Sequence, residues 1–310
     1  MDLVFTSPAT CDVVARRTIR NVFKEMEGAV NLLGDRTKPL VMELARRGKI
    51  PRGAIDPIYN AIFKELIELE TIMAVQYDRV ERSRLSTKER VDLSFIQVIS
   101  DGEDDLEFLA CRSSATRQLL DFVISPMGFY VSHHVMSRYM QRVRRPAKTF
   151  FEDILRPMRM AMAMCGPVAG RANKEIALPF SSGMLMGYLQ MYRRSSDDQW
   201  GTWQRYTRHD IEDLNSHAVV TPYANFQFTF HIKTFISVEN MSPTKKAVYD
   251  QLLALESEFE QELALLGHFC FTMLPIDSVS DKEIEPLLAK AIEIAKSDEW
   301  NRNFPNSVAA

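Results

Sequence analysis

A histidine and two arginines lie along one edge of a predicted helix in the segment SHHVMSRYMQR, residues 132–142. His134, Arg138 and Arg142 are four positions apart, so each advances only ~40° around a helix of 3.6 residues per turn. Arginine offers a fixed fork of donors that suits phosphate, and histidine exchanges protons near neutral pH. The pattern therefore indicates phosphate chemistry, such as cleavage of RNA by its own 2′-hydroxyl, which needs a proton carrier and fixed cations.

The same helix also fits an ordinary amphipathic element whose arginines pair with acids elsewhere. Ser132 is a residue type that caps helix N-termini through its hydroxyl oxygen. The apolar residues that cover the rest of the circumference are Val135, Met136, Tyr139, Met140 and Val143. The sequence leaves both interpretations open, because exposure of the polar edge depends on what packs beside it.

A second polar constellation lies in the predicted strand FQFTFHIKTFI, residues 226–236. Alternation places Phe226, Phe228, Phe230, Ile232 and Ile236 on one face, which is predicted to be core. The other face carries Gln227, Thr229, His231 and Lys233. His231 and Lys233 are candidates to assist phosphate chemistry, although an outward polar face is the alternative. Thr234 falls on the apolar face unless a bulge intervenes.

Aromatic and basic residues also alternate in a predicted polar loop before that strand. Trp203, Arg205 and Tyr206 are candidates to bind substrate, since aromatic rings stack on unpaired bases and arginines hold phosphates. Packing of the rings over the sheet is the alternative interpretation.

We predict no metal centre and no cofactor. His209 and Asp210 resemble the ligand pair of metal-dependent HD phosphohydrolases, but they lie beside predicted strands instead of inside a helical bundle. The acidic stretch 101–105 lacks the length of a calcium loop and is expected to be a solvated turn. The sequence has no glycine-rich nucleotide loop and no nucleophile elbow.

The expected elements describe an α+β fold: an N-terminal helical block, then helices packed on an antiparallel sheet, then C-terminal helices. Residues 1–85 are predicted as a helical module and 86–310 as an α+β domain, with a catalytic core at about 115–270. The predicted helices are 13–33, 37–45, 56–82, one from 132, 149–165, 243–266 and 281–296. The predicted strands are 91–100, 106–111, 175–180, 184–192 and 226–238.

Composition narrows the class of protein. A net charge of -3 excludes a strongly basic field over the whole chain. Four scattered cysteines and no secretion signal or long apolar run predict a cytoplasmic protein without a membrane partner. Seven methionines between Met158 and Met191 are expected to fill the core.

The arrangement of Ser132, His134, Arg138 and Arg142 at the start of a helix resembles the signature of small toxin-like domains of the RelE-like ribonuclease type, which phages, plasmids and bacterial chromosomes carry. Val135 stands where that family usually has alanine. The resemblance implies a metal-independent ribonuclease that acts on RNA. The alternative is a non-enzymatic interaction protein, of phage or mobile-element type, whose N-terminal helices bind a protein or nucleic-acid partner.

Overall fold

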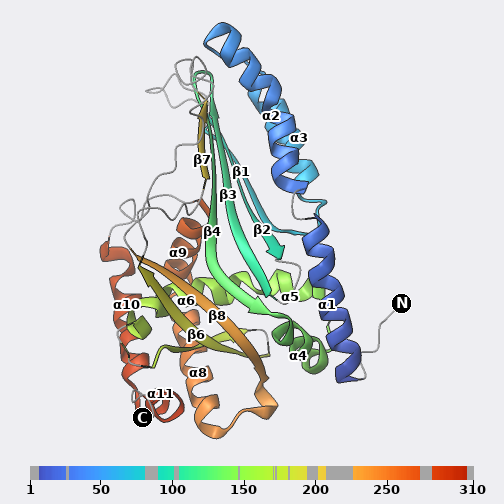
Figure 1. The fold of residues 1–310 in the computed structure, drawn as a ribbon. Helices are drawn as coiled ribbons and strands as arrows, with labels where there is room; N and C mark the ends of the chain where they lie inside the picture. Colours follow the sequence, from blue (N-terminus) through green and yellow to red (C-terminus); the bar gives the residue numbers. More distant parts are fainter. Residues whose placement is uncertain are drawn as a thin grey trace.

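The chain folds as helices packed on a long twisted sheet in a computed structural model (Figure 1). The structure describes residues 7–25, 28–80, 90–100, 105–145, 147–169, 171, 173–180, 182–193, 202–206, 226–272 and 281–305. The predicted α+β class is confirmed, with helices at both ends of the chain.

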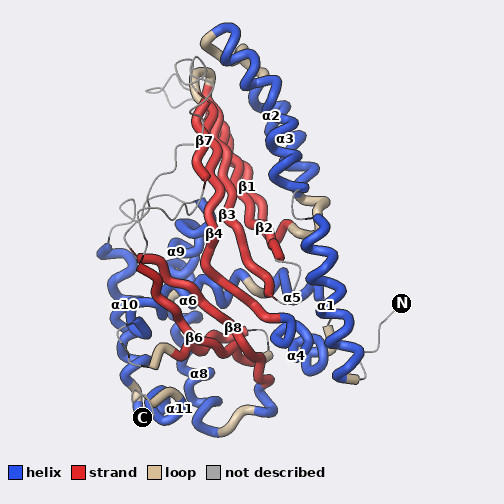
Figure 2. Tube along the Cα trace, viewed as in Figure 1, coloured by secondary structure: helices blue, strands red, loops and turns tan. Residues whose placement is uncertain are grey.

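Helices and strands follow each other in blocks along the chain, as Figure 2 shows. The described helices are α1 (Pro8–Glu25), α2 (Gly28–Arg47), α3 (Ile55–Leu66), α4 (His133–Val143), α5 (Ala147–Asp153), α6 (Leu155–Ala169), α8 (Pro243–Glu258), α9 (Glu260–Thr272), α10 (Asp281–Lys296), α11 (Asp298–Asn303) and the 3-10 turn η1 (Val238–Asn240). The described strands are β1 (Ile72–Val80), β2 (Arg90–Ser100), β3 (Asp105–Thr116), β4 (Leu120–Ser132), β5 (Glu175–Phe180), β6 (Gly183–Arg193), β7 (Thr202–Tyr206) and β8 (Phe226–Ser237).

One sheet contains all of these strands, in the order β1-β2-β3-β4-β8-β6-β5, with β7 also paired to β4. The pairs are antiparallel except β4 and β8, which run parallel and match Tyr130 with His231. The predicted antiparallel sheet is therefore corrected to a mixed one. The reason is the connection: between β4 and β8 the chain passes through α4, α5 and α6 and the strands β5, β6 and β7, and so long a crossover allows β8 to run parallel to β4.

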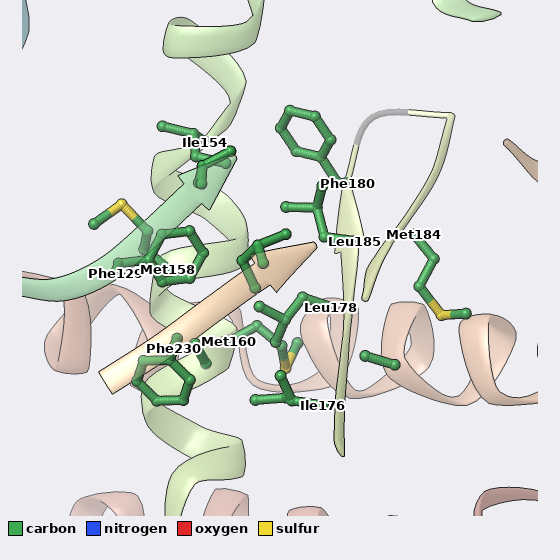
Figure 3. Packing of buried hydrophobic residues seen from close by; sticks show 14 of the residues in the cluster. Phe129, Ile154, Met158, Met160, Ile176, Leu178, Phe180, Met184, Leu185 and Phe230 are labelled. Carbon is green, nitrogen blue, oxygen red and sulfur yellow. The ribbon is translucent and has the colours of Figure 1, made fainter. Parts of the chain in front are cut away.

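The larger core lies between the sheet and the helices α1, α4, α6, α8 and α10. Figure 3 shows side chains from α6, β5, β6 and β8 meeting there, among them Phe180, Leu185 and Phe230. Met158, Met160, Met164 and Met184 are all buried in this core, so the expectation of core-filling methionines is confirmed for them. These contacts hold the apolar face of β8 against the helices.

A second core covers the opposite face at the other end of the sheet, where α3 packs on β1 and β2 and α2 packs on α3. Leu93 and Phe95 belong to this second core, whereas Ile96 and Val98 of the same strand belong to the first. Alternating side chains of one strand point to opposite faces, so β2 is buried on both. Tyr59 of α3 is anchored by a 2.6 Å hydrogen bond between its hydroxyl and that of Ser113.

Several predicted boundaries were wrong. The helix predicted over 56–82 ends at Leu66, and residues 72–80 instead form β1, which pairs with β2. Alternation in IMAVQYDRV fits a strand, and pairing satisfies its backbone groups. The predicted helices 13–33 and 37–45 were divided at the wrong place, since α2 runs through residues 34–36, and the predicted helix 149–165 extends past its expected end to Ala169. The predicted boundary near residue 85 lies outside the described residues.

Other predicted elements are confirmed with small shifts. The strands 91–100 and 106–111 form the antiparallel pair β2 and β3, and 281–296 is α10. The strands 175–180, 184–192 and 226–238 correspond to β5, β6 and β8. The predicted helices 149–165 and 243–266 are each divided in two.

Arg171 fixes the C-terminal helices to the end of α6. Its buried guanidinium donates to the carbonyl oxygens of Ala295 (2.5 Å) and Phe304 (2.7 Å) and to Oδ1 of Asn301 (2.9 Å).

We expect Arg171→Ala to lower the free energy of unfolding by about 3 kcal/mol, because buried acceptors lose charged donors. Urea denaturation measures this. Arg159→Ala, an exposed arginine of α6, is the control, and equal small losses for both variants would contradict the anchor role.

Candidate functional site

The helix α4 begins at the residue where β4 ends. Ser132 holds the N-cap position with an extended backbone, but its hydroxyl makes no cap hydrogen bond, which corrects the prediction. That hydroxyl is buried instead. Four of the residues predicted to be buried are so, namely Val135, Met136, Tyr139 and Met140. Tyr139 packs against Phe235 of β8, with ring centroids 5.8 Å apart, so the apolar side of α4 is fixed beside β8.

The polar edge of α4 lies where the sequence places it. His134 and Arg138 are exposed, and Arg142 is half-buried. Arg138 reaches the sheet: its Nη1 donates to Oγ1 of Thr234 over 2.5 Å. His134 instead lies against His133, with ring centroids 4.0 Å apart. The structure therefore joins the helix edge to β8 through Arg138, one turn beyond the histidine.

A bulge in β8 places Thr234 within reach of Arg138. Opposite β6, Gly187 pairs with Ile232 whereas Met186 pairs with Thr234, so Lys233 is the extra residue. An extra residue reverses the facing of everything beyond it. Phe235 is consequently fully buried, and Ile236, predicted to be core, takes the other face with Thr234. Phe230 and Ile232 are buried as predicted.

Three stacked rings form a row across the polar face of the sheet. Tyr130 of β4 stacks on His231 of β8 at 4.9 Å and 7°, and Tyr188 of β6 stacks on its other side at 5.0 Å and 12°. Both faces of the imidazole are thus covered by tyrosine. The Tyr130 hydroxyl donates to Oε1 of Glu107 at 2.9 Å, and the Thr229 hydroxyl lies 3.2 Å from Nε2 of His231. His231 is held rigidly and presents ring edges to a ligand.

The surroundings of His231 keep its imidazole neutral. Burial lowers the pKa of His231, the positive charge of Lys233 lowers it further, and the charge of Asp105 opposes these effects. Burial also raises the pKa of Glu107, against the hydrogen bond from Tyr130. A neutral imidazole can accept a proton, which is the property required of a general base.

Two cations near this row have no carboxylate partner among the residues that the structure describes. Arg138 contacts the Thr234 hydroxyl, and Lys233 is exposed with its Nζ 5.9 Å from the ring centroid of Tyr188. Elsewhere on the sheet, arginines are neutralised: Arg90 and Arg112 both contact the carboxylate of Asp92. Lys233, two residues beyond His231 in the strand, and Arg138, in contact with Thr234, are therefore the cations of this face that can contact an anion.

The predicted substrate-binding residues lie at a different place on the sheet. Trp203, Arg205 and Tyr206 belong to strand β7, which corrects the predicted loop, and their side chains lie outside what is described. Trp203 pairs with Val123, seven residues before Tyr130, which is roughly 23 Å along a strand. This part of β4 also lines an open recess of about 330 Å³ with Arg90, Arg112, Ser114, Thr116, Leu119 and Asp121.

Other candidates lie outside the described residues, namely His209, Asp210 and the acidic turn 101–104. Sequence reasoning missed Tyr130 and Tyr188, whose positions follow from pairing of strands far apart in the chain. It also missed Glu107 as the acceptor of the Tyr130 hydroxyl. One available signal was the stretch FYV, residues 129–131, whose aromatic and β-branched residues are typical of a strand.

Comparisons with protein-family models, with curated proteins and with solved structures found no match. Within the described part of the chain, each helix is too short or too polar to cross a bilayer.

The first prediction of the site concerns the titration of His231. We expect its pKa, measured by NMR of the imidazole, to lie below the ordinary 6.5, and Lys233→Gln to raise it because a nearby positive charge is removed. The stability contributed by the neutral ring is complete above pH 6.5 and is lost as the pH falls toward the lowered pKa. Lys64→Gln, at an exposed site on α3, should leave the pKa unchanged. A pKa at or above the ordinary value in the wild type would contradict this account.

The second prediction concerns the close approach of β6 to β8. A Cβ on Gly187 would lie 2.0 Å from the carbonyl oxygen of His231, which is backbone and cannot move aside. Gly187→Ala should therefore separate the strands at the bulge, displace His231 and destabilise the fold by about 1–3 kcal/mol. Gly34→Ala, where a Cβ meets nothing within 4 Å, is the control and should not destabilise. Thermal unfolding and the His231 NMR signal measure both effects.

Proposed function

We propose that the protein binds single-stranded RNA across α4 and β8 and cleaves it without a metal ion. The observation that carries the proposal is the contact of Arg138 with Thr234, because it brings a helix cation to the strand that holds His231 and Lys233. The resemblance to RelE-like ribonucleases, through Ser132, His134, Arg138 and Arg142, supports the same class of chemistry.

His231 is the group that we assign to proton transfer. Its lowered pKa leaves the imidazole unprotonated at neutral pH, so it can accept the proton of a 2′-hydroxyl. The two stacked tyrosines fix the ring, and a base held in one orientation needs less ordering when the substrate binds. Lys233 and Arg138 would stabilise the charge that builds on the phosphate.

The cations lie along β8. Lys233 lies two residues beyond His231 in the strand, and Thr234, the contact of Arg138, lies opposite Met186, two residues along β6 from Tyr188, which lies opposite His231. That separation is roughly 7 Å along a strand. We infer that the phosphates of a bound polynucleotide would follow this line along β8. Because tyrosines cover both faces of His231, bases would contact ring edges instead of stacking on the imidazole.

The second candidate is an RNA-binding protein that does not cleave. The observation in its favour is the hydrogen bond between Thr229 and Nε2 of His231, which occupies one of the two ring nitrogens. In this case the imidazole and its tyrosines shape the surface, and the N-terminal helices provide a docking site for a protein partner. Binding would then depend on Arg138 and Lys233 but not on His231.

The protein fits a reducing compartment such as the cytoplasm. Cys11, Cys111 and Cys165 are free thiols, and burial raises the pKa of each. A raised pKa keeps the thiol protonated and unreactive, as expected of residues that serve packing.

Cleavage of single-stranded RNA by the purified full chain in EDTA tests the proposal. We expect cleavage with 2′,3′-cyclic phosphate ends, a loss of roughly 10²–10⁴-fold in rate for His231→Gln, and weaker binding for Arg138→Gln. The dependence of log affinity on log salt should also become shallower by about 0.7 for Arg138→Gln, the value for one single-strand phosphate contact.

Lys64→Gln removes one exposed positive charge on α3 and serves as the matched control for both measurements. Cleavage unaffected by both site variants would exclude this site, and cleavage abolished by EDTA would exclude the metal-independent route. Binding that is lost in Arg138→Gln, in the absence of any cleavage by the wild type, would establish the second candidate.

A further inference from the structure

A second cluster of chemically active side chains lies where α1 meets α4, and Figure 1 shows the two helices running past each other. Asp12 comes from α1, and His133 and His134 open α4. One ligand atom from each of these three residues lies within 4.8 Å of the others. The side chain of His133 is 3% exposed and that of Asp12 is 35% exposed, so the cluster is buried on one side and open on the other.

The hydrogen bonds define the state of His133. Arg16 places its Nη2 2.9 Å from Nε2 of His133, and its Nε donates to Oδ2 of Asp12 over 3.1 Å. A guanidinium has only donors, so Nε2 of His133 must be the acceptor and carries a lone pair. Two acceptors from different helices, His133 and Asp12, therefore face one cation.

We propose that Asp12, His133 and His134 bind a divalent transition-metal ion, with zinc the ion that best fits the ligand set. Two imidazoles and a carboxylate are ligands that zinc accepts at about 2.0–2.2 Å. Ligands of a tetrahedral ion at such distances are about 3.3–3.5 Å apart. Oδ1 of Asp12 lies 3.4 Å from Nε2 of His133, so two of the three ligands already have the required separation.

His134 and Arg16 supply the movement that binding requires. The His134 side chain is exposed and can close on the ion by a change of rotamer. The Arg16 side chain is 40% exposed, so it can turn outward when the ion takes its place. Arg16 thus competes with the metal ion for Asp12 and His133, and the bound ion replaces the positive charge of Arg16 beside these two residues.

The proposed metal site connects the N-terminal helix α1 to α4, the helix that carries the polar edge with Arg138. Asp12 and His133 are far apart in the sequence, and an ion shared between them would hold α1 on α4. Three protein ligands leave one tetrahedral position open for water, the pattern of sites that exchange a ligand. This site does not rest on the proposed RNA chemistry, since none of its ligands is assigned a role at His231.

Metal titration of the full chain, stripped with EDTA and dialysed, tests the site. Zn²⁺ should bind at one ion per chain by calorimetry and raise the melting temperature, and Co²⁺ should give the intense visible absorption of a tetrahedral site. Asp12→Asn and His134→Gln should each weaken binding by roughly tenfold or more, since even residues outside the ligand set change affinity 10–100-fold. Arg16→Gln should instead tighten binding, because it removes the competing cation.

His231→Gln removes a histidine from strand β8, outside the cluster of α1 and α4, and should leave the metal affinity unchanged. Equal weakening by His231→Gln and His134→Gln, or binding of several ions per chain, would show adventitious binding and overturn the proposal. Arg16→Gln keeps the proposal testable if Asp12→Asn does not fold: unchanged or weaker affinity in a folded Arg16→Gln variant would also overturn it. RNA cleavage in EDTA is measured separately, so failure of one proposal does not decide the other.

Discussion

The parallel pairing of β4 with β8 is the constraint on which the rest of the molecule depends. It involves only three residue pairs, centred on Tyr130 and His231, yet it connects the strands β1–β4 to the strands β5, β6 and β8 in one sheet. The helix α4 starts at the end of β4, while β8 continues beyond the paired segment. The parallel direction therefore places the helix beside the rest of β8 and brings Arg138 to Thr234.

The bulge at Lys233 turns the hydroxyl of Thr234 toward Arg138, so the two side chains can form a hydrogen bond. Without the extra residue, Thr234 would face the core and the Arg138 guanidinium would have no hydroxyl to contact. The bulge is possible because Gly187 lets β6 approach the backbone of His231, where any larger residue would collide. The bulge between β6 and β8 thus determines which side chains lie beside the row of stacked rings. It also leaves Arg138 and Lys233 on the polar face of the sheet.

Local patterns predicted much of this structure, and long-range pairing accounts for what they missed. The buried face of α4, the hairpin of β2 and β3 and the limits of α10 follow from periodicity within a few turns or strands. The stacking of Tyr130, His231 and Tyr188 depends on three strands from distant parts of the chain. The register between such strands cannot be read from the sequence of any single strand. The sequence allowed a bulge near Thr234 without predicting one, because an alternating pattern does not show at which residue the alternation breaks.

A chain of net charge -3 has no strongly basic field overall, so the proposed binding of a polyanion has to depend on local charges such as those of α4. Its exposed edge carries His134 and, one turn later, Arg138, whose positions are about 6 Å apart along the axis at 1.5 Å per residue. The proposed metal cluster and the contact of Arg138 with Thr234 thus lie on one helix, within about one turn of each other. A shift of α4 caused by one proposed ligand would therefore move the residues proposed to bind the other.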